Sequence, residues 1–200
     1  MRWGMVIDLV KCVGCQTCTI ACKQEHALPP EVFWRYVADC EVGEYPNVKR
    51  LFLPMQCMHC ANPPCVPVCP TGASQKRDDG IVWVDYQQCV GCGYCAAACP
   101  YRARHLVHDQ TWYFPDGPTP PEAMTTDPER GGVMTKCTFC RERVDGGSQP
   151  ACVVSCIANA IHFDDLDDPE SRVSRLIKAR GAVRLMPELG TDPSVYYLTE

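Results

Sequence analysis

Cysteine spacing constrains this chain more than any other feature of its sequence. Sixteen of the 17 cysteines fall into four motifs, and each motif holds a C-x2-C pair followed by a C-x3-C pair. The first and third motifs are the compact C-x2-C-x2-C-x3-C, whereas four residues separate the two pairs in the second motif and 11 in the fourth. Thiols at these spacings converge as metal ligands must, and disulfide frameworks do not repeat this pattern.

The motifs also show that the chain is internally repeated. The compact motif of Cys12, Cys15, Cys18 and Cys22 recurs 77 residues later as Cys89, Cys92, Cys95 and Cys99. The two stretched motifs correspond at an offset of 80 for their first pair and 87 for their second, because the later copy has seven additional residues. Each half carries one compact and one stretched motif, so duplication is the simplest interpretation.

The compact motif is the cysteine run of bacterial ferredoxins, in which three thiolates bind one [4Fe–4S] cluster and the fourth ligates the other cluster of a pair. Cys69 and Cys99 are both followed by Pro, whereas Cys22 and Cys156 are not. This difference predicts that motifs two and three form one pair and motifs one and four the other. The predicted ligands are Cys12, Cys15, Cys18 and Cys156 at site I; Cys22, Cys137, Cys140 and Cys152 at site II; Cys57, Cys60, Cys65 and Cys99 at site III; and Cys69, Cys89, Cys92 and Cys95 at site IV.

This pairing predicts an α+β fold of two nested bacterial-ferredoxin-like modules, with irregular loops and little regular secondary structure, stabilised by four [4Fe–4S] clusters. We expect residues 1–56 to pair with 137–163 around an inner module at 57–108. Residues 109–136 are expected to be an inserted loop, and 164–200 a C-terminal helix and tail. Four cubanes in two such modules would form a row that conducts electrons.

A few regular elements are expected between the motifs. Residues 81–84 follow a turn and are predicted to form a strand, with 5–7 as their counterpart. Short helical turns are expected after Cys18 and Cys95. Asp168 and Pro169 predict a helix start, and apolar residues at 173, 176 and 177 predict a stripe that packs on its own domain.

Composition excludes several functions. The net charge is -5 without a polybasic run, which disfavours nucleic acid as a partner. No stretch approaches the ~18 apolar residues of a membrane span, and the N-terminal residues show no export signal, so we expect a partner to carry the chain to any membrane. Motifs for flavin, nicotinamide, nucleotide or haem are absent, and no catalytic residue is predicted.

Some residues near the motifs have a simpler interpretation than ligation. Cys40 stands outside every motif and is expected to be a small buried apolar residue. His59 is expected to line a cluster or to form a hydrogen bond near a sulfur. Lys11, Lys23 and Lys136 flank predicted ligands, where positive charge would raise a cluster's potential, but solvated lysines are an equal alternative. Zinc could occupy the fourth motif, but compact motifs supply too many thiols for it.

Four longer stretches resemble a known family: MVIDLVKCVGC at the start, PPCVPVCPTGA at 63–73, CVGCGYCAAACPY at 89–101 and DDLDDPESRVSRLIK at 164–178. They are similar to the iron–sulfur subunits of complex molybdoenzymes, such as the dimethyl sulfoxide, polysulfide, thiosulfate, tetrathionate and respiratory arsenate reductases of anaerobic respiration. The resemblance implies an electron-transfer subunit without catalysis of its own. It also implies a catalytic partner with a molybdenum or tungsten bis-pterin cofactor and a membrane subunit that reacts with quinone, on either side of the membrane.

Two other functions remain open from the sequence. A free-standing polyferredoxin would carry electrons without a fixed partner, and a hydrogenase- or formate-dehydrogenase-linked carrier would keep the same row of clusters. The cysteine-free segment 164–200 disfavours the free carrier, and this segment with the 109–136 loop is the predicted partner interface. A zinc-stabilised interaction module is the non-redox alternative.

Overall fold

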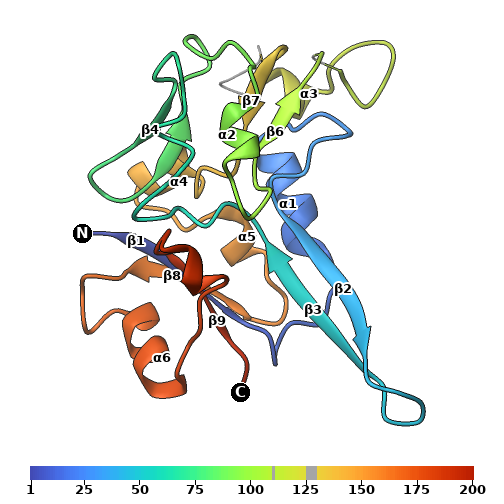
Figure 1. Cartoon of the computed structure of the whole chain (residues 1–200). Coiled ribbons are helices and arrows are strands. Elements are labelled where there is room, and N and C mark those ends of the chain that lie inside the picture. Colours follow the sequence, from blue (N-terminus) through green and yellow to red (C-terminus); the bar gives the residue numbers. More distant parts are fainter. Residues whose placement is uncertain (110, 125–129) are drawn as a thin grey trace.

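The computed structural model describes residues 1–109, 111–124 and 130–200. Short helices and strands alternate with long connections that carry most of the cysteines (Figure 1). The predicted mixture of helices and strands with little regular structure is therefore confirmed.

One three-stranded sheet joins the two ends of the chain. Its central strand β1 (Trp3–Asp8) pairs antiparallel with β8 (Ile161–Asp165) and parallel with β9 (Val195–Leu198), so the order is β8-β1-β9. Met5 and Ile7 face the main core, which also contains predicted cluster ligands, whereas Val6 faces the opposite side. This alternation follows from the two-residue period of a strand. The tail beyond 164 is thus built into the sheet.

Helix α6 (Arg172–Arg180) covers the outer face of this sheet (Figure 1). Its Val173 is fully buried with Val6 and Leu198, and Leu176 and Ile177 pack beside them, so the predicted apolar stripe is confirmed. The predicted helix start is wrong by several residues. Ser171, and not Asp168, is the N-cap, and its hydroxyl accepts a hydrogen bond from the Ser174 amide. Asp168 instead closes a turn that precedes the helix, because its carboxylate accepts from the Glu170 amide.

An ion pair between Arg180 and Asp8 fastens α6 to β1. The Asp8 side chain is 1% exposed, and its carboxylate also accepts from the backbone amides of Val10 and Lys11. Burial is the largest single influence on this carboxyl and disfavours its charge, but the hydrogen bonds from Arg180, Lys11 and Val10 and the charge of Arg180 together outweigh it and lower the pKa of Asp8. The pair therefore stabilises both the sheet and the turn that leads to Cys12.

Replacing Arg180 with Ala should leave the Asp8 carboxylate buried without its cation. Because Arg180 is partly exposed, we expect a loss of about 2 kcal/mol, below the full cost of breaking a buried pair, or ~4–8 °C in Tm for a chain of this size. Thermal unfolding under anaerobic conditions measures this. Lys178→Ala, at an exposed position of the same helix, is the control, and equal Tm values for the two variants would contradict the prediction.

Three antiparallel hairpins lie between the motifs. Strand β2 (Tyr36–Val42) pairs with β3 (Lys49–Met55), β4 (Ser74–Lys76) with β5 (Val82–Val84), and β6 (His105–Val107) with β7 (Val133–Thr135). The first and third hairpins are counterparts in the repeat, since β3 and β7 each end two residues before a stretched motif. Both predicted strands, at 5–7 and 81–84, are confirmed.

The short helices carry or flank the cysteines. Helix α1 (Thr17–Glu25) and helix α2 (Tyr94–Ala97) begin one residue before Cys18 and Cys95, where helical turns were predicted. The others are α3 (Pro120–Ala123), α4 (Arg141–Asp145), α5 (Ala151–Val154) and the 3-10 turn at Pro187–Leu189. Helix α1 of the first motif packs against α5 of the fourth, which brings the outer motifs together.

Two expectations from the sequence are wrong. The segment 109–136 is not wholly irregular, because α3 and β7 lie in it; residues 110 and 125–129 of that prediction fall outside the described residues. Cys40 is exposed on β2, and not buried, because its strand belongs to a hairpin that extends away from the core (Figure 1).

Candidate metal centres

Three of the predicted ligand sets each surround one cavity. Sites I, IV and III enclose about 340, 290 and 310 Å³ of space between atoms, counting the part open to solvent. The thiols that line these cavities are Cys12, Cys15, Cys18 and Cys156; Cys69, Cys89, Cys92 and Cys95; and Cys57, Cys60, Cys65 and Cys99. The similar sizes and identical donor sets indicate the same kind of occupant at each position.

The thiols of site II also lie together, deep in the protein. Burial raises the pKa of the Cys22 thiol well above its ordinary value, and the neighbouring sulfurs of Cys137, Cys152 and Cys140 raise it further. Burial likewise raises the pKa of Cys137 to about 12. Thiols in such surroundings lose their protons only when a positive partner stabilises the resulting thiolate, and iron ions would provide that charge.

Neighbouring sulfurs place the four sites in a row. Cys152 of site II is close enough to Cys18 of site I for the two sulfurs to repel each other. The sulfurs of Cys137 at site II and Cys57 at site III are also close enough to repel each other. The same holds for Cys95 at site IV and Cys65 at site III. The order is therefore I–II–III–IV. The exposed thiols Cys15 and Cys92 belong to the two end sites.

The stretched motifs meet through equivalent residues. His59 and Phe139 occupy the same position in motifs two and four, and both have a positive φ, at 43° and 55°. Their rings stack with centroids 3.7 Å apart, and each donates its backbone amide to the first cysteine of its motif at 3.5 Å. The duplicated halves thus face each other across this pair, at the boundary between sites II and III.

The histidines lie close to the sulfurs without forming a ligand set. His59 is fully buried, and its Nδ1 accepts from the Val82 amide at 3.0 Å, which agrees with its predicted place beside a cluster. No sequence motif indicated a role for His26, whose Nε2 lies 3.2 Å from the sulfur of Cys140. Burial lowers the pKa of His26 to about 4, so the ring is neutral near pH 7.

Local backbone structure brings the compact motifs close to their cavities. Gly14 and Gly91 have φ near +67° and +66°, and a Cβ would collide with the Phe52 ring at the first and with the Gly132 carbonyl oxygen at the second. Only glycine meets both requirements at no cost. Asp8 and its repeat counterpart Asp85 each accept a backbone amide two residues ahead and so turn the chain toward the motif.

Several buried cations were missed or misjudged from the sequence. Lys136 is fully buried and donates to the carbonyl oxygens of Val82 and Cys137, and Lys23 is buried with its ammonium on the carbonyl oxygen of Pro29, so neither is solvated. Lys11 is half-exposed. Arg35 and Arg104 are buried beside predicted ligands, and no motif indicates them because they lie outside the cysteine runs.

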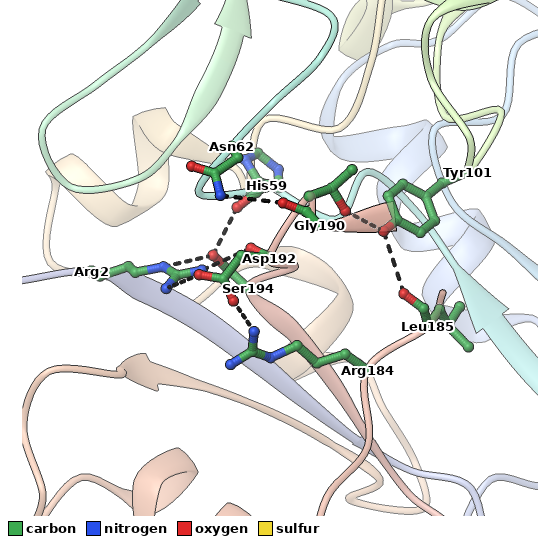
Figure 2. Close-up of polar contacts among 10 residues, drawn as sticks. Arg2, His59, Asn62, Tyr101, Arg184, Leu185, Gly190, Asp192 and Ser194 are labelled. Carbon is green, nitrogen blue, oxygen red and sulfur yellow. Dashed lines mark hydrogen bonds and ion pairs between the residues drawn. The ribbon is translucent and has the colours of Figure 1, made fainter. Parts of the chain in front are cut away.

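The C-terminal segment forms polar contacts with residues around site III (Figure 2). The Tyr101 hydroxyl lies 2.6 Å from that of Thr191, and Asn62 donates to the carbonyl oxygen of Gly190. Ser194 donates its hydroxyl to the carbonyl oxygen of His59 at 2.7 Å, and Arg2 bonds to Ser194 in turn. Residues 184–194 therefore pack against residues that lie in or beside the motif of site III, although they do not line its cavity.

The donor sets fit iron–sulfur clusters better than the alternatives. All 17 cysteines are free, so none forms a disulfide. Within residues 1–109, 111–124 and 130–200, no three Cys, His, Asp or Glu side chains converge closely enough to hold a single metal ion. The thiols surround wider cavities, as four-iron clusters require.

Comparison with known proteins decides the family. A model of the 4Fe-4S dicluster domain matches residues 48–113 and 118–166. This chain belongs to that family. The iron–sulfur protein is 45% identical over 215 residues to a subunit of the selenate reductase of Mesobacillus selenatarsenatis, covering 100% of this chain and 72% of that protein.

Two further relatives are named as iron–sulfur subunits. The arsenate respiratory reductase iron–sulfur subunit of a Shewanella species is 38% identical, with 99% of this chain and 96% of that protein covered. The iron–sulfur cluster-binding subunit of a menaquinone reductase from Nitratidesulfovibrio vulgaris is also 38% identical, with 100% and 89% covered. The prediction of an electron-transfer subunit of an oxidoreductase complex with [4Fe–4S] clusters is confirmed. No helix in the described part of the chain is long and apolar enough to cross a membrane.

Proposed function

We propose that the iron–sulfur protein holds four [4Fe–4S] clusters on the cysteines of sites I to IV and relays single electrons along them. The observation that carries this proposal is the row of four thiol sets, of which only the end sites have exposed thiols. Electrons enter and leave through exposed ends, whereas the buried inner sites II and III pass them on. Each [4Fe–4S] cluster accepts or donates one electron, and the residues around it provide its ligands, its hydrogen bonds and its shielding from water.

The clusters belong to two nested ferredoxin-like modules. Sites III and IV lie in the inner module, at 57–108, and sites I and II join residues 1–56 to 137–163. The packing of α1 against α5 supports this assignment, because it brings motif one to motif four. The tail at 164–200 completes the outer module and contacts residues beside site III.

At its two ends the row connects different partners. One is a catalytic subunit with a molybdenum or tungsten bis-pterin cofactor, and the other is a membrane subunit that reacts with quinone. The relatives named as subunits of selenate, arsenate and menaquinone reductases support this arrangement. The protein is then held at the membrane by its partners, with the 109–136 segment among the contacts.

Anaerobic purification from the native source tests the function. We expect about sixteen irons per chain, as four four-iron clusters require, together with a large partner that contains molybdenum or tungsten. Metal analysis and mass spectrometry of the purified complex measure both. Iron at this level without a partner would favour a diffusible polyferredoxin. A partner of the hydrogenase type would leave the row of clusters in place and replace the proposed molybdenum or tungsten subunit. Zinc in place of iron would contradict the clusters themselves.

A further inference from the structure

Arg35 is a buried cation at the boundary between sites I and II. It is 2% exposed, and its Nη1 donates to Gln56 Oε1 at 3.0 Å and approaches the sulfur of Cys152 at 3.6 Å. Burial alone would lower the pKa of Arg35, but negative charge at the sulfurs of Cys152 and Cys18 raises it above its ordinary value. One sulfur belongs to site II and the other to site I, so this cation faces both.

Arg104 occupies the corresponding place between sites III and IV. It is 6% exposed, and its Nη2 donates to the sulfur of Cys65 at 2.8 Å while Nη1 donates to the Ser74 hydroxyl at 2.7 Å. Burial alone would lower the pKa of Arg104, but the sulfurs of Cys65 and Cys57 at site III and of Cys95 at site IV raise it above its ordinary value. Each predicted module thus has one buried arginine between its two clusters.

The two arginines are structural counterparts in the duplicated chain. Arg35 immediately precedes β2, and Arg104 immediately precedes β6. In both hairpins, the first residue of the leading strand pairs with the last residue of the strand that runs into a stretched motif: Tyr36 with Met55, and His105 with Thr135. The cysteine spacing alone does not reveal this equivalence, because the two arginines lie at different distances from the compact motifs.

A buried arginine needs a negative partner. Removing a guanidinium from water is costly unless charge and hydrogen bonds compensate it. Yet Nε and Nη2 of Arg35 have no hydrogen-bond acceptor among the described residues, and no carboxylate is bonded to either arginine among the bonds described for the two side chains. Thiolate ligands and the sulfides of a cluster carry the missing negative charge, and they are the acceptors that these donors lack.

We propose that Arg35 and Arg104 are positioning residues for electron transfer, each holding one positive charge between the two clusters of its module. This inference rests on the proposed cluster ligands. Reduction adds one negative charge to a cluster in surroundings of low dielectric constant, where a nearby cation stabilises the reduced form. Each arginine therefore raises the potentials of both flanking clusters.

Variants that remove the charge test the proposal in the purified complex. We expect Arg35→Gln to make sites I and II harder to reduce and leave III and IV unchanged, and Arg104→Gln to do the reverse. The expected shift is at least tenfold in the ratio of reduced to oxidised cluster at a fixed solution potential, which corresponds to about 59 mV for one electron. Electron paramagnetic resonance during a potentiometric titration measures it.

The controls separate charge from structure. Arg35→Lys and Arg104→Lys keep the charge and should recover most of each shift, and Arg50→Gln removes an arginine whose side chain is 62% exposed on β3. Iron content tests the ligands separately, since wild-type protein with far fewer than about sixteen irons would overturn the cluster assignment. Full iron content with unchanged potentials in both Gln variants would overturn the role of the arginines. Equal iron loss in the Gln and Lys variants would also overturn it, because the side chains would then only support the fold.

Discussion

A Cys22→Ser variant is expected to alter the cluster at site II and leave site I intact, although Cys22 lies in the same motif as the site I ligands. Its sulfur lies among those of Cys137, Cys140 and Cys152, more than a hundred residues further along the chain. Serine is a poorer ligand for iron than a thiolate, so the corner iron that Cys22 binds should be lost, or the whole cluster with it. Iron should fall from about sixteen per chain to about fifteen or about twelve.

Spectroscopy distinguishes the proposed arrangement, in which Cys22 binds the cluster of site II, from one in which Cys22 binds the same cluster as Cys12, Cys15 and Cys18. Electron paramagnetic resonance of the variant should lack the signal of one [4Fe–4S] cluster, and Cys156→Ser should remove a different signal, that of site I. If Cys22→Ser and Cys140→Ser remove the same signal, both residues bind the cluster of site II, and the proposed arrangement is supported. Cys40→Ser is the matched control, since this cysteine is exposed on β2 and belongs to no predicted ligand set. If Cys22→Ser and Cys12→Ser removed the same signal, the nested arrangement would be wrong.

The cysteine motifs could be recognised in the sequence more readily than the fold around them. Metal ligation requires fixed spacing between thiols, so the motifs at 12–22 and 89–99 are visible in the sequence itself. The strand at 81–84 was predictable because a turn and a β-branched run adjoin it. These signals are local, and each depends on residues that are close in the chain.

The predictions that failed concern residues whose contact partners lie far away in the sequence. Residues 133–135 form β7 because they pair with β6, nearly thirty residues earlier, and nothing nearby indicates that partner. Cys40 is exposed because a hairpin carries it away from the core. Lys136 is buried because the carbonyl oxygens of Val82 and Cys137 receive its ammonium. Arg35 and Arg104 belong to the same class, since their sulfur partners come from other motifs.

Chemical removal of the clusters is expected to unfold the protein. In the proposed arrangement, sites I and II join the start of the chain to residues 137–156, so each cluster would close a loop of more than a hundred residues. A covalent cross-link that closes such a loop is worth about 4–5 kcal/mol in the chain-entropy model. The two loops are nested, so the second contributes less than the first, but the first alone is a large part of the roughly 5–15 kcal/mol by which a domain of this kind is stable. The main core depends on the clusters as well, because Cys18, Cys60 and Cys152 are part of it.

Hydrogen exchange shows which strands lose their structure when the clusters are removed. After anaerobic extraction of iron with a chelator, amides of β1 and β9 should lose their protection, since only the outer module holds these strands together. The Met5 amide, which donates to the carbonyl oxygen of Ser194, is a suitable reporter. Adding back iron and sulfide should restore protection, and protein incubated with the iron-loaded chelator is the control. Protection of β1 that survives complete iron removal would mean that apolar packing of Met5, Ile7 and Phe163 suffices to hold the sheet. The clusters would then occupy a fold that forms without them, and would not act as its cross-links.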